Sequence, residues 1–154
     1  MLRVEQILRN EEGKNVLKDS FETIIIKANY IIVKKEEGYG LYKLCDYKQI
    51  LNCEWDKITF EGEYIVASRY SQFAVFDSEG KPILKCNWDK VVLYENGILV
   101  SKNKVQGFFN YNGDIILDCV WKRIEPFHNV LLAFRGNGAK RMTFDYDGNI
   151  IEDK

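Results

Sequence analysis

The sequence contains one histidine, two prolines and no apolar run long enough to cross a bilayer. Because His128 is the only imidazole, a cysteine–histidine nucleophile pair is not expected. With two prolines and no low-complexity stretch, we expect neither a linker nor a disordered arm. The longest apolar runs, such as residues 130–134, fall far short of the roughly 20 residues of a membrane-spanning helix, so no membrane partner is expected.

An excess of charge of one sign is missing too, because 22 basic and 23 acidic residues leave a net charge of −1. This balance gives no general attraction to nucleic acid or to an anionic membrane, so any such attraction would have to be local. The first residues, from Met1 to Gln6, include charges and lack the apolar core of an export signal. We therefore expect a cytoplasmic protein whose four cysteines are reduced thiols.

A short phrase recurs along the chain at a fixed interval. Its three tryptophans are 33 residues apart, each follows a cysteine by two residues, and a phenylalanine takes the same place in an earlier copy. A period of this size marks one supersecondary unit, repeated so that each copy buries its apolar face against its neighbours. We expect these positions to form the structural core: Phe21, Cys53, Trp55, Cys86, Trp88, Cys119 and Trp121.

Each copy has the pattern of two short hairpins. Residues 73–76 lead through a turn that contains Gly80 to residues 81–84, and Asn112-Gly113 fills the same turn in the next copy. We predict a single all-β domain of about four and a half repeats of short antiparallel strands, as a curved open array or a propeller-like ring. Its predicted units are residues 1–37, 38–71, 72–104 and 105–138, with a partial unit at 139–154.

These repeats resemble the bacterial WG-containing repeat family. The turn glycines match at Gly13, Gly80, Gly113 and Gly148, and the later aromatic-Asp-x-apolar segment matches at residues 55–58 and 88–91. The leading aromatic-glycine dipeptide stands as Tyr39-Gly40 and Gln106-Gly107, and the Trp-Gly pair itself is absent from every unit. The resemblance covers about residues 13–154 and implies an all-β repeat array that acts as an interaction module. It implies no catalytic activity.

Two series of basic residues recur with the same period. One series ends the last strand of successive units, at Lys35, Arg69, Lys102 and Arg135, and the other follows the aromatic position, at Lys57, Lys90 and Arg123. Repeat symmetry turns a sequence position into a stripe or ring in space, so one interpretation is a cationic rim that binds a nucleic-acid backbone or an acidic protein. The other is that the cations are solvated and pair with acidic residues of neighbouring units.

Three aromatic residues, Tyr70, Tyr94 and Phe127, lie in connections between strands. Exposed beside cations, they would be hot spots for a protein partner; packed inward, they would belong to the core beneath the loops. The two aspartates after the tryptophans, Asp56 and Asp89, are expected to accept local hydrogen bonds from turn backbone rather than to form a catalytic pair.

The sequence lacks a glycine-rich phosphate loop, a nucleophile elbow and a metal-binding histidine pair. We therefore expect no catalytic residue, no metal site and no cofactor. The leading hypothesis is a non-enzymatic protein-binding module, such as an adaptor, an immunity protein or an inhibitor of a larger bacterial or phage protein. The alternative is a nucleic-acid-binding protein that uses the cationic rim, and a hydrolase with an unrecognised set of carboxylates is third.

Overall fold

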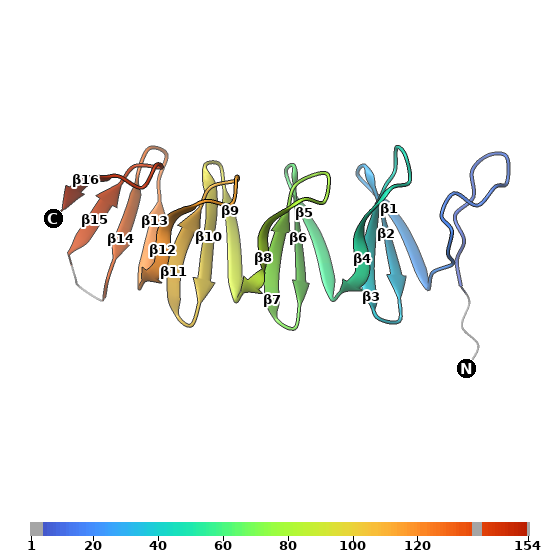
Figure 1. Ribbon diagram of the computed structural model, residues 1–154, viewed down its shortest axis with the longest axis horizontal. Coiled ribbons are helices and arrows are strands. Elements are labelled where there is room, and N and C mark those ends of the chain that lie inside the picture. The colour runs from blue at the N-terminus through green and yellow to red at the C-terminus, as the bar shows by residue number, and fades with distance from the viewer. Residues whose placement is uncertain (1–4, 137–139, 154) are drawn as a thin grey trace. The chain divides into compact units, whose positions relative to one another are not determined.

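The computed structural model describes residues 5–136 and 140–153, and every regular element in that part of the chain is a β-strand. Sixteen strands form four antiparallel sheets of four strands each, and within each sheet the strands are neighbours in chain order (Figure 1). The predicted all-β repeat fold is confirmed. The described residues contain no helix with the length and apolar character needed to cross a membrane.

The four sheets have closely similar strand lengths. The first contains β1 (Thr23–Lys27), β2 (Tyr30–Lys35), β3 (Gly38–Lys43) and β4 (Gln49–Trp55). The second contains β5 (Lys57–Glu61), β6 (Tyr64–Arg69), β7 (Gln72–Phe76) and β8 (Pro82–Trp88). The third contains β9 (Lys90–Tyr94), β10 (Gly97–Lys102), β11 (Val105–Phe109) and β12 (Ile115–Trp121). The fourth contains β13 (Arg123–Pro126), β14 (Leu131–Phe134), β15 (Arg141–Phe144) and β16 (Ile150–Asp153).

Each of the first three sheets ends at the repeated tryptophan, and the next begins two residues later. The predicted units begin elsewhere in the same period, because a periodic sequence does not specify where one copy starts. Ile98 and Val100 of β10 are fully buried, as the apolar run of a second strand requires. Opposite the bulge between β11 and β12, a Cβ on Gly107 would lie 2.9 Å from the Cα of Cys119, so the close approach of these strands requires glycine.

Four hairpin turns share an Asx residue three positions before a glycine. In the turn of residues 110–113, the Asn110 Oδ1 accepts hydrogen bonds from the amides of Asn112 (3.0 Å) and Asp114 (2.9 Å). Gly113 has a φ of +86°, which is why glycine is needed there. The same pattern recurs in the turns of residues 10–13, 77–80 and 145–148. Sequence reasoning found the glycines and missed the Asx, whose fixed spacing was the available signal.

Asp56 and Asp89 each stabilise a tight turn elsewhere in the same repeat. The Oδ2 of Asp56 accepts a hydrogen bond of 2.9 Å from the amide of Tyr70, and the Oδ2 of Asp89 accepts one of 3.0 Å from the amide of Asn103. Tyr70 and Asn103 have φ values of +54° and +52°, in the left-handed region that such turns require. The predicted local hydrogen bonds are confirmed.

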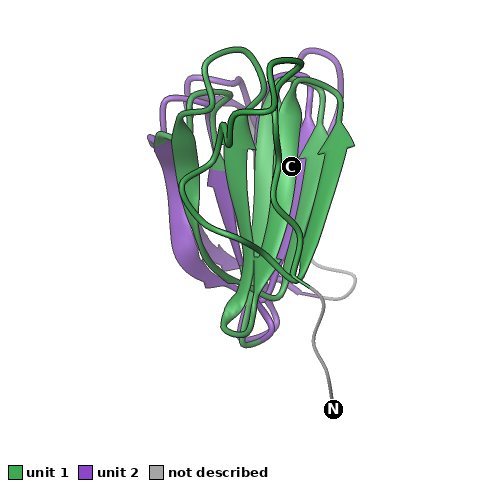
Figure 2. Cartoon of the chain, turned by 90° about the vertical axis from the view of Figure 1, so that its right-hand side faces the viewer, with its two compact units in different colours: residues 1–70, 76–81 green, residues 71–75, 82–154 purple. Residues whose placement is uncertain are grey.

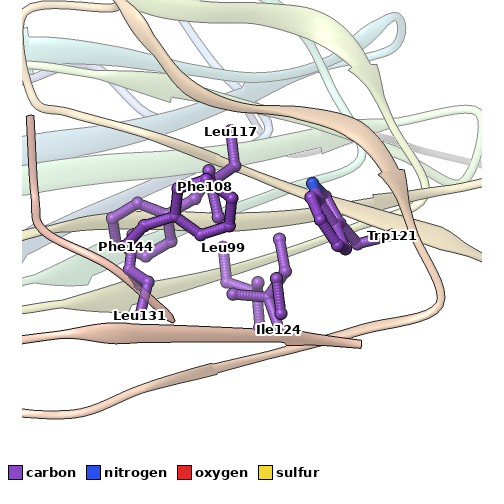
Figure 3. Close-up of a cluster of buried hydrophobic side chains, with 8 residues drawn as sticks. Leu99, Phe108, Leu117, Trp121, Ile124, Leu131 and Phe144 are labelled. Atoms are coloured by element: carbon purple, nitrogen blue, oxygen red, sulfur yellow. The ribbon is translucent and has the colours of Figure 1, made fainter. Parts of the chain in front are cut away.

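The chain divides into two compact units, residues 1–70 with 76–81 and residues 71–75 with 82–154 (Figure 2). In the second unit, buried side chains of β10, β11 and β12 pack against those of β13, β14 and β15 (Figure 3). In the first unit, Leu17, Phe21, Ile31 and Val33 form the equivalent buried cluster. Consecutive sheets of a unit therefore share an apolar layer, which is how a repeat buries a face that it cannot cover alone.

The three tryptophans share one kind of aromatic contact. Each indole meets a phenylalanine of the next sheet edge-on, with centroid distances of 5.6 Å for Trp55–Phe76, 5.4 Å for Trp88–Phe109 and 5.6 Å for Trp121–Phe144. Phe21 repeats the arrangement with Tyr42 at 6.0 Å. The exposed fractions of Phe21, Trp55 and Trp121 are 1%, 7% and 5%, whereas Trp88 is half-buried.

Candidate protein-binding site

The first cationic series is bound to neighbouring residues of the same unit. The Nζ of Lys35 lies 2.7 Å from the Asp19 Oδ2 and 5.4 Å from the centroid of the Phe21 ring. The hydrogen bond to Asp19 raises the pKa of Lys35. Arg69 approaches Glu54, with 3.4 Å between NH1 and Oε1, and its guanidinium lies over the neighbouring Tyr70 ring.

The other members of the two basic series also contact neighbouring side chains, except Lys57 and Lys90. The guanidinium of Arg135 lies 4.6 Å from the centroid of Trp121, and Lys102 donates a hydrogen bond to Asn87. In the second series, the Nε of Arg123 lies 3.2 Å from an oxygen of Glu125. Within the described part of the chain, Lys57 and Lys90 are exposed and make no ion pair. Five of the seven basic side chains thus contact neighbouring residues of their own predicted repeat, and three of these partners are acidic.

Two of the three aromatic residues singled out in the sequence lie together, whereas Tyr70 is 77% exposed and does not line their hollow. Tyr94 and Phe127 line one hollow of about 270 Å³, with exposed fractions of 37% and 52%. We call this the aromatic hollow, and its other lining residues are Glu95, Asn96, Pro126, His128 and Tyr146. It lies within the second unit, where the loop between β9 and β10 meets the loop between β13 and β14.

Hydrogen bonds join the loops that form the aromatic hollow. Asn96 donates from its Nδ2 to the carbonyl oxygen of His128 over 3.3 Å, which links the two loops. The hydroxyl of Tyr146, from the turn of the fourth sheet, donates to the carbonyl oxygen of Phe127. Burial raises the pKa of Tyr146, so its hydroxyl keeps its proton and remains a donor well above neutral pH. The position of Phe127 is thereby fixed from both sides of the hollow.

The aromatic stack of the first unit has no counterpart beside the aromatic hollow. Tyr30 and Gly97 are both the first residue of a second strand, so they occupy the same repeat position. In the first unit, the Tyr30 ring stacks on Phe60 with centroids 4.9 Å apart and planes at 6°. Phe60 corresponds to Pro126, and Gly97 supplies no ring that could stack there. A Cβ on Gly97 would overlap Phe108, so the core requires glycine there.

Sequence reasoning identified Tyr94 and Phe127 but missed Asn96, Pro126 and Tyr146 as their neighbours. The available signal for Tyr146 was its repeat mate Tyr111, which stands second in the equivalent turn and donates its hydroxyl to the carbonyl oxygen of Tyr94. Asn96 and Tyr146 come from two different loops and Pro126 from the end of β13, so their proximity follows from the stacking of sheets rather than from spacing in the sequence.

The chemical groups around the aromatic hollow suit binding. His128 is exposed in a bend, and the lining contains a single carboxylate, Glu95. Among the described residues, no three histidine, cysteine, aspartate or glutamate side chains group closely enough to hold a metal ion. Exposed aromatic rings with a few polar neighbours are typical of hot spots that receive an apolar side chain of a partner.

The four cysteines fall into two classes. Cys53, Cys86 and Cys119 are half-buried, less deeply than the sequence predicts, whereas Cys45 is exposed in the irregular loop before β4. Burial raises the pKa of both Cys53 and Cys119. A raised pKa keeps a thiol protonated and unreactive, so these residues have the character of packing groups rather than nucleophiles.

Solved structures with a related arrangement of strands are distant in sequence. Kluyveromyces lactis Hsv2p is 16% identical over 79% of this chain and 46% of its own length, with a TM-score of 0.41. Hsv2 of Kluyvelomyces marxianus is 12% identical over 88% of this chain and 51% of its own, with a TM-score of 0.40. The N-terminal domain of Nup159 is 9% identical over 82% of this chain and 40% of its own, with a TM-score of 0.41.

The chain spans about half the length, or less, of these solved structures. No curated protein matches the sequence. The sequence pattern of the WG containing repeat matches residues 107–135, which run from Gly107 of β11 to Arg135, the residue after β14. This match confirms the resemblance to the WG-containing repeat over that segment, which contains the predicted turn glycine and aromatic position.

Proposed function

We propose that this chain is a non-enzymatic protein-binding module that engages its partner through the aromatic hollow. One observation carries the proposal: Tyr94 and Phe127, 33 residues apart, present exposed rings to the same hollow. Tyrosine is enriched among hot-spot residues, and rings held in place by neighbours lose little conformational entropy on binding. Tyr146 and Asn96 provide that support through their hydrogen bonds to the adjoining loops.

The partner that fits is a protein with a projecting apolar side chain. A hollow of about 270 Å³ accommodates one large side chain rather than a whole cofactor. The polar groups at its margin, such as Asn96 and Glu95, suit hydrogen bonds to the backbone of the bound segment. In a bacterial or phage cytoplasm, such a module would serve as an adaptor, an immunity protein or an inhibitor of a larger protein.

The test compares binding of one purified partner to matched variants of the full chain. The partner is isolated by affinity purification and mass spectrometry, and its Kd is then measured by calorimetry. Phe127→Ala is expected to weaken binding by about thirtyfold, the effect of losing a hot spot of about 2 kcal/mol. Ile115→Ala is the control, because Ile115 is 58% exposed and lies outside the hollow. Its Kd is expected to stay within twofold of the wild-type value.

Two results would overturn the proposal. One is a stoichiometric partner whose affinity is unchanged by both Tyr94→Ala and Phe127→Ala. The other is a partnerless monomer with intrinsic catalytic turnover. Nucleic acid bound with an affinity that falls steeply as salt rises, and lost on charge reversal at Arg69 and Lys102, would instead identify the cationic alternative.

A further inference from the structure

Residues 5–21 repeat the second half of a sheet. They correspond to residues 105–121 at an offset of 100, and the same contacts recur in both segments. Gln6 bridges Phe21 as Gln106 pairs with Trp121. The Oε1 of Gln6 accepts a 2.8 Å hydrogen bond from the amide of Ile24, and that of Gln106 accepts a 2.7 Å bond from the amide of Ile124. The segment thus takes the place of the third and fourth strands of a further sheet, joined by two isolated bridges, Gln6 to Phe21 and Arg9 to Asn15.

The first two strands of that sheet are not found among the described residues. At the offset of 100, Met1 corresponds to Ser101, and no described residue outside the four complete sheets is equivalent to residues 90–100. Those residues form β9 and most of β10 in the third sheet. Every one of the sixteen described strands already belongs to a complete sheet of four, so none is left to fill the gap.

An apolar hollow lies where the missing strand would pack. We call it the strand seat; its volume is about 480 Å³ and it is lined by Gln6, Ile7, Leu8, Ile24 and Ile26. In the third sheet, the equivalents of Leu8 and Ile24 are Phe108 and Ile124, whose exposed fractions are 0% and 3%.

Strand β10 covers Phe108 and Ile124. Leu99 of that strand is the register partner of Phe108, and it belongs to the same buried cluster as Ile124. Without such a strand, Leu8 and Ile24 are only half-buried, and Ile26 is 54% exposed. Because a β-strand covers the equivalent surface in the third sheet, the repeat predicts that a β-strand would cover the strand seat.

We propose that the strand seat accepts a β-hairpin from a partner protein, whose inner strand pairs antiparallel with residues 5–9. An extended strand satisfies backbone donors and acceptors at an open strand edge, and its side chains cover the exposed leucine and isoleucines. The second strand of every complete sheet has the required pattern of three consecutive aliphatic residues: residues 31–33, 65–67, 98–100 and 131–133. This site lies in the first unit and is independent of the aromatic hollow.

The chain's own sequence supplies the probe for this site. A synthetic peptide of residues 90–100 is added to the full chain, and amide hydrogen exchange is measured by mass spectrometry. Exchange over residues 5–9 is expected to slow at least tenfold, because their amides enter a strand ladder. A peptide with Leu99→Asp and Val100→Asp is the control, and it is expected to give no protection because charges would enter an apolar seat.

Two neighbouring isoleucines provide a matched pair of protein variants. Ile26 lines the strand seat, whereas Ile25 points to the opposite face of β1 and is 46% exposed. Ile26→Glu is expected to weaken peptide binding at least tenfold, and Ile25→Glu is expected to leave it within twofold. Equal effects of the two substitutions would overturn the proposal.

An isolated two-stranded hairpin is marginally stable, so the peptide is also tested in covalent form. Residues 90–100 are placed directly before Met1 of the full chain, which gives a high effective concentration. Protection of residues 5–9 in this extended chain, lost on Ile26→Glu, supports the proposal. Absence of protection with both the free and the linked hairpin would overturn it.

Discussion

Substituting Gly113 by alanine tests how consecutive sheets dock. Gly113 lies in the hairpin turn of the third sheet with a φ of +86°, and an added Cβ would be 2.8 Å from the carbonyl oxygen of Ile83 in the second sheet. Gly80 and Gly148 make the same approach, at 2.8 Å, to the carbonyl oxygens of Ile50 and Ile116. The turn glycine is therefore the point where one repeat rests on the preceding one.

The expected magnitude has two parts. A left-handed alanine costs about 1–2 kcal/mol, and restriction of the unfolded chain returns about 0.4–1 kcal/mol, so backbone strain alone leaves about 1 kcal/mol. The contact with Ile83 adds an overpacking cost of about 1–3 kcal/mol, because 2.8 Å is shorter than the 3.4 Å at which ordinary van der Waals contact begins. Gly113→Ala should therefore lower the free energy of unfolding by about 2–4 kcal/mol.

Gly62 is the matched control. Its φ is +59° and a Cβ there would meet nothing within 4 Å, so Gly62→Ala should cost only the strain of about 1 kcal/mol. Unfolding in urea is followed by tryptophan fluorescence and by circular dichroism, which must coincide because repeat proteins can unfold in parts. If Gly113→Ala costs no more than about 0.5 kcal/mol beyond Gly62→Ala, the docking contact does not stabilise the fold.

Three further predictions concern the turns and the thiols. Asp89→Ala should lower the free energy of unfolding by about 1 kcal/mol in urea titrations, since the amide of Asn103 loses its acceptor; an unchanged midpoint would refute this. Cys45 should be alkylated by iodoacetamide well before Cys53 and Cys119, because it is exposed and burial raises the pKa of those two thiols; peptide mapping would reveal a different order. Hydrogen bonds from Asn149 and its neighbours lower the pKa of Asp145, so its charge stabilises the fold above its ordinary pKa of 3.8, and this contribution is lost as the pH falls through the lowered value. Thermal midpoints of wild type and Asp145→Asn should therefore converge at low pH, and a constant difference down to acid pH would contradict this assignment.

Much of the fold follows from the spacing of residues that are close together in the sequence. The interval of 33 residues between Trp55, Trp88 and Trp121 predicts a repeated unit, and the three indoles do share one kind of aromatic contact. Residues two apart share a face of a strand, and a glycine with positive φ reverses the chain, so strands and turns follow from neighbouring residues alone. The hydrogen bonds of Asp56 and Asp89 belong to this class, since each closes a turn within its own repeat.

The sites depend on which residues face one another when sheets stack. Periodicity predicts equivalent positions, but it does not show that Phe127 and Tyr94 border one hollow. It also suggests a cationic rim, whereas Lys35 and Arg135 lie over aromatic rings of their units. The strands, the turns and the 33-residue repeat can be read from the amino-acid sequence, because they depend on residue spacing and local backbone preference. The aromatic hollow and the strand seat become visible only in the folded protein. The first depends on contacts between different strands and loops, and the second on a surface that no described strand covers. Spacing along the chain encodes neither.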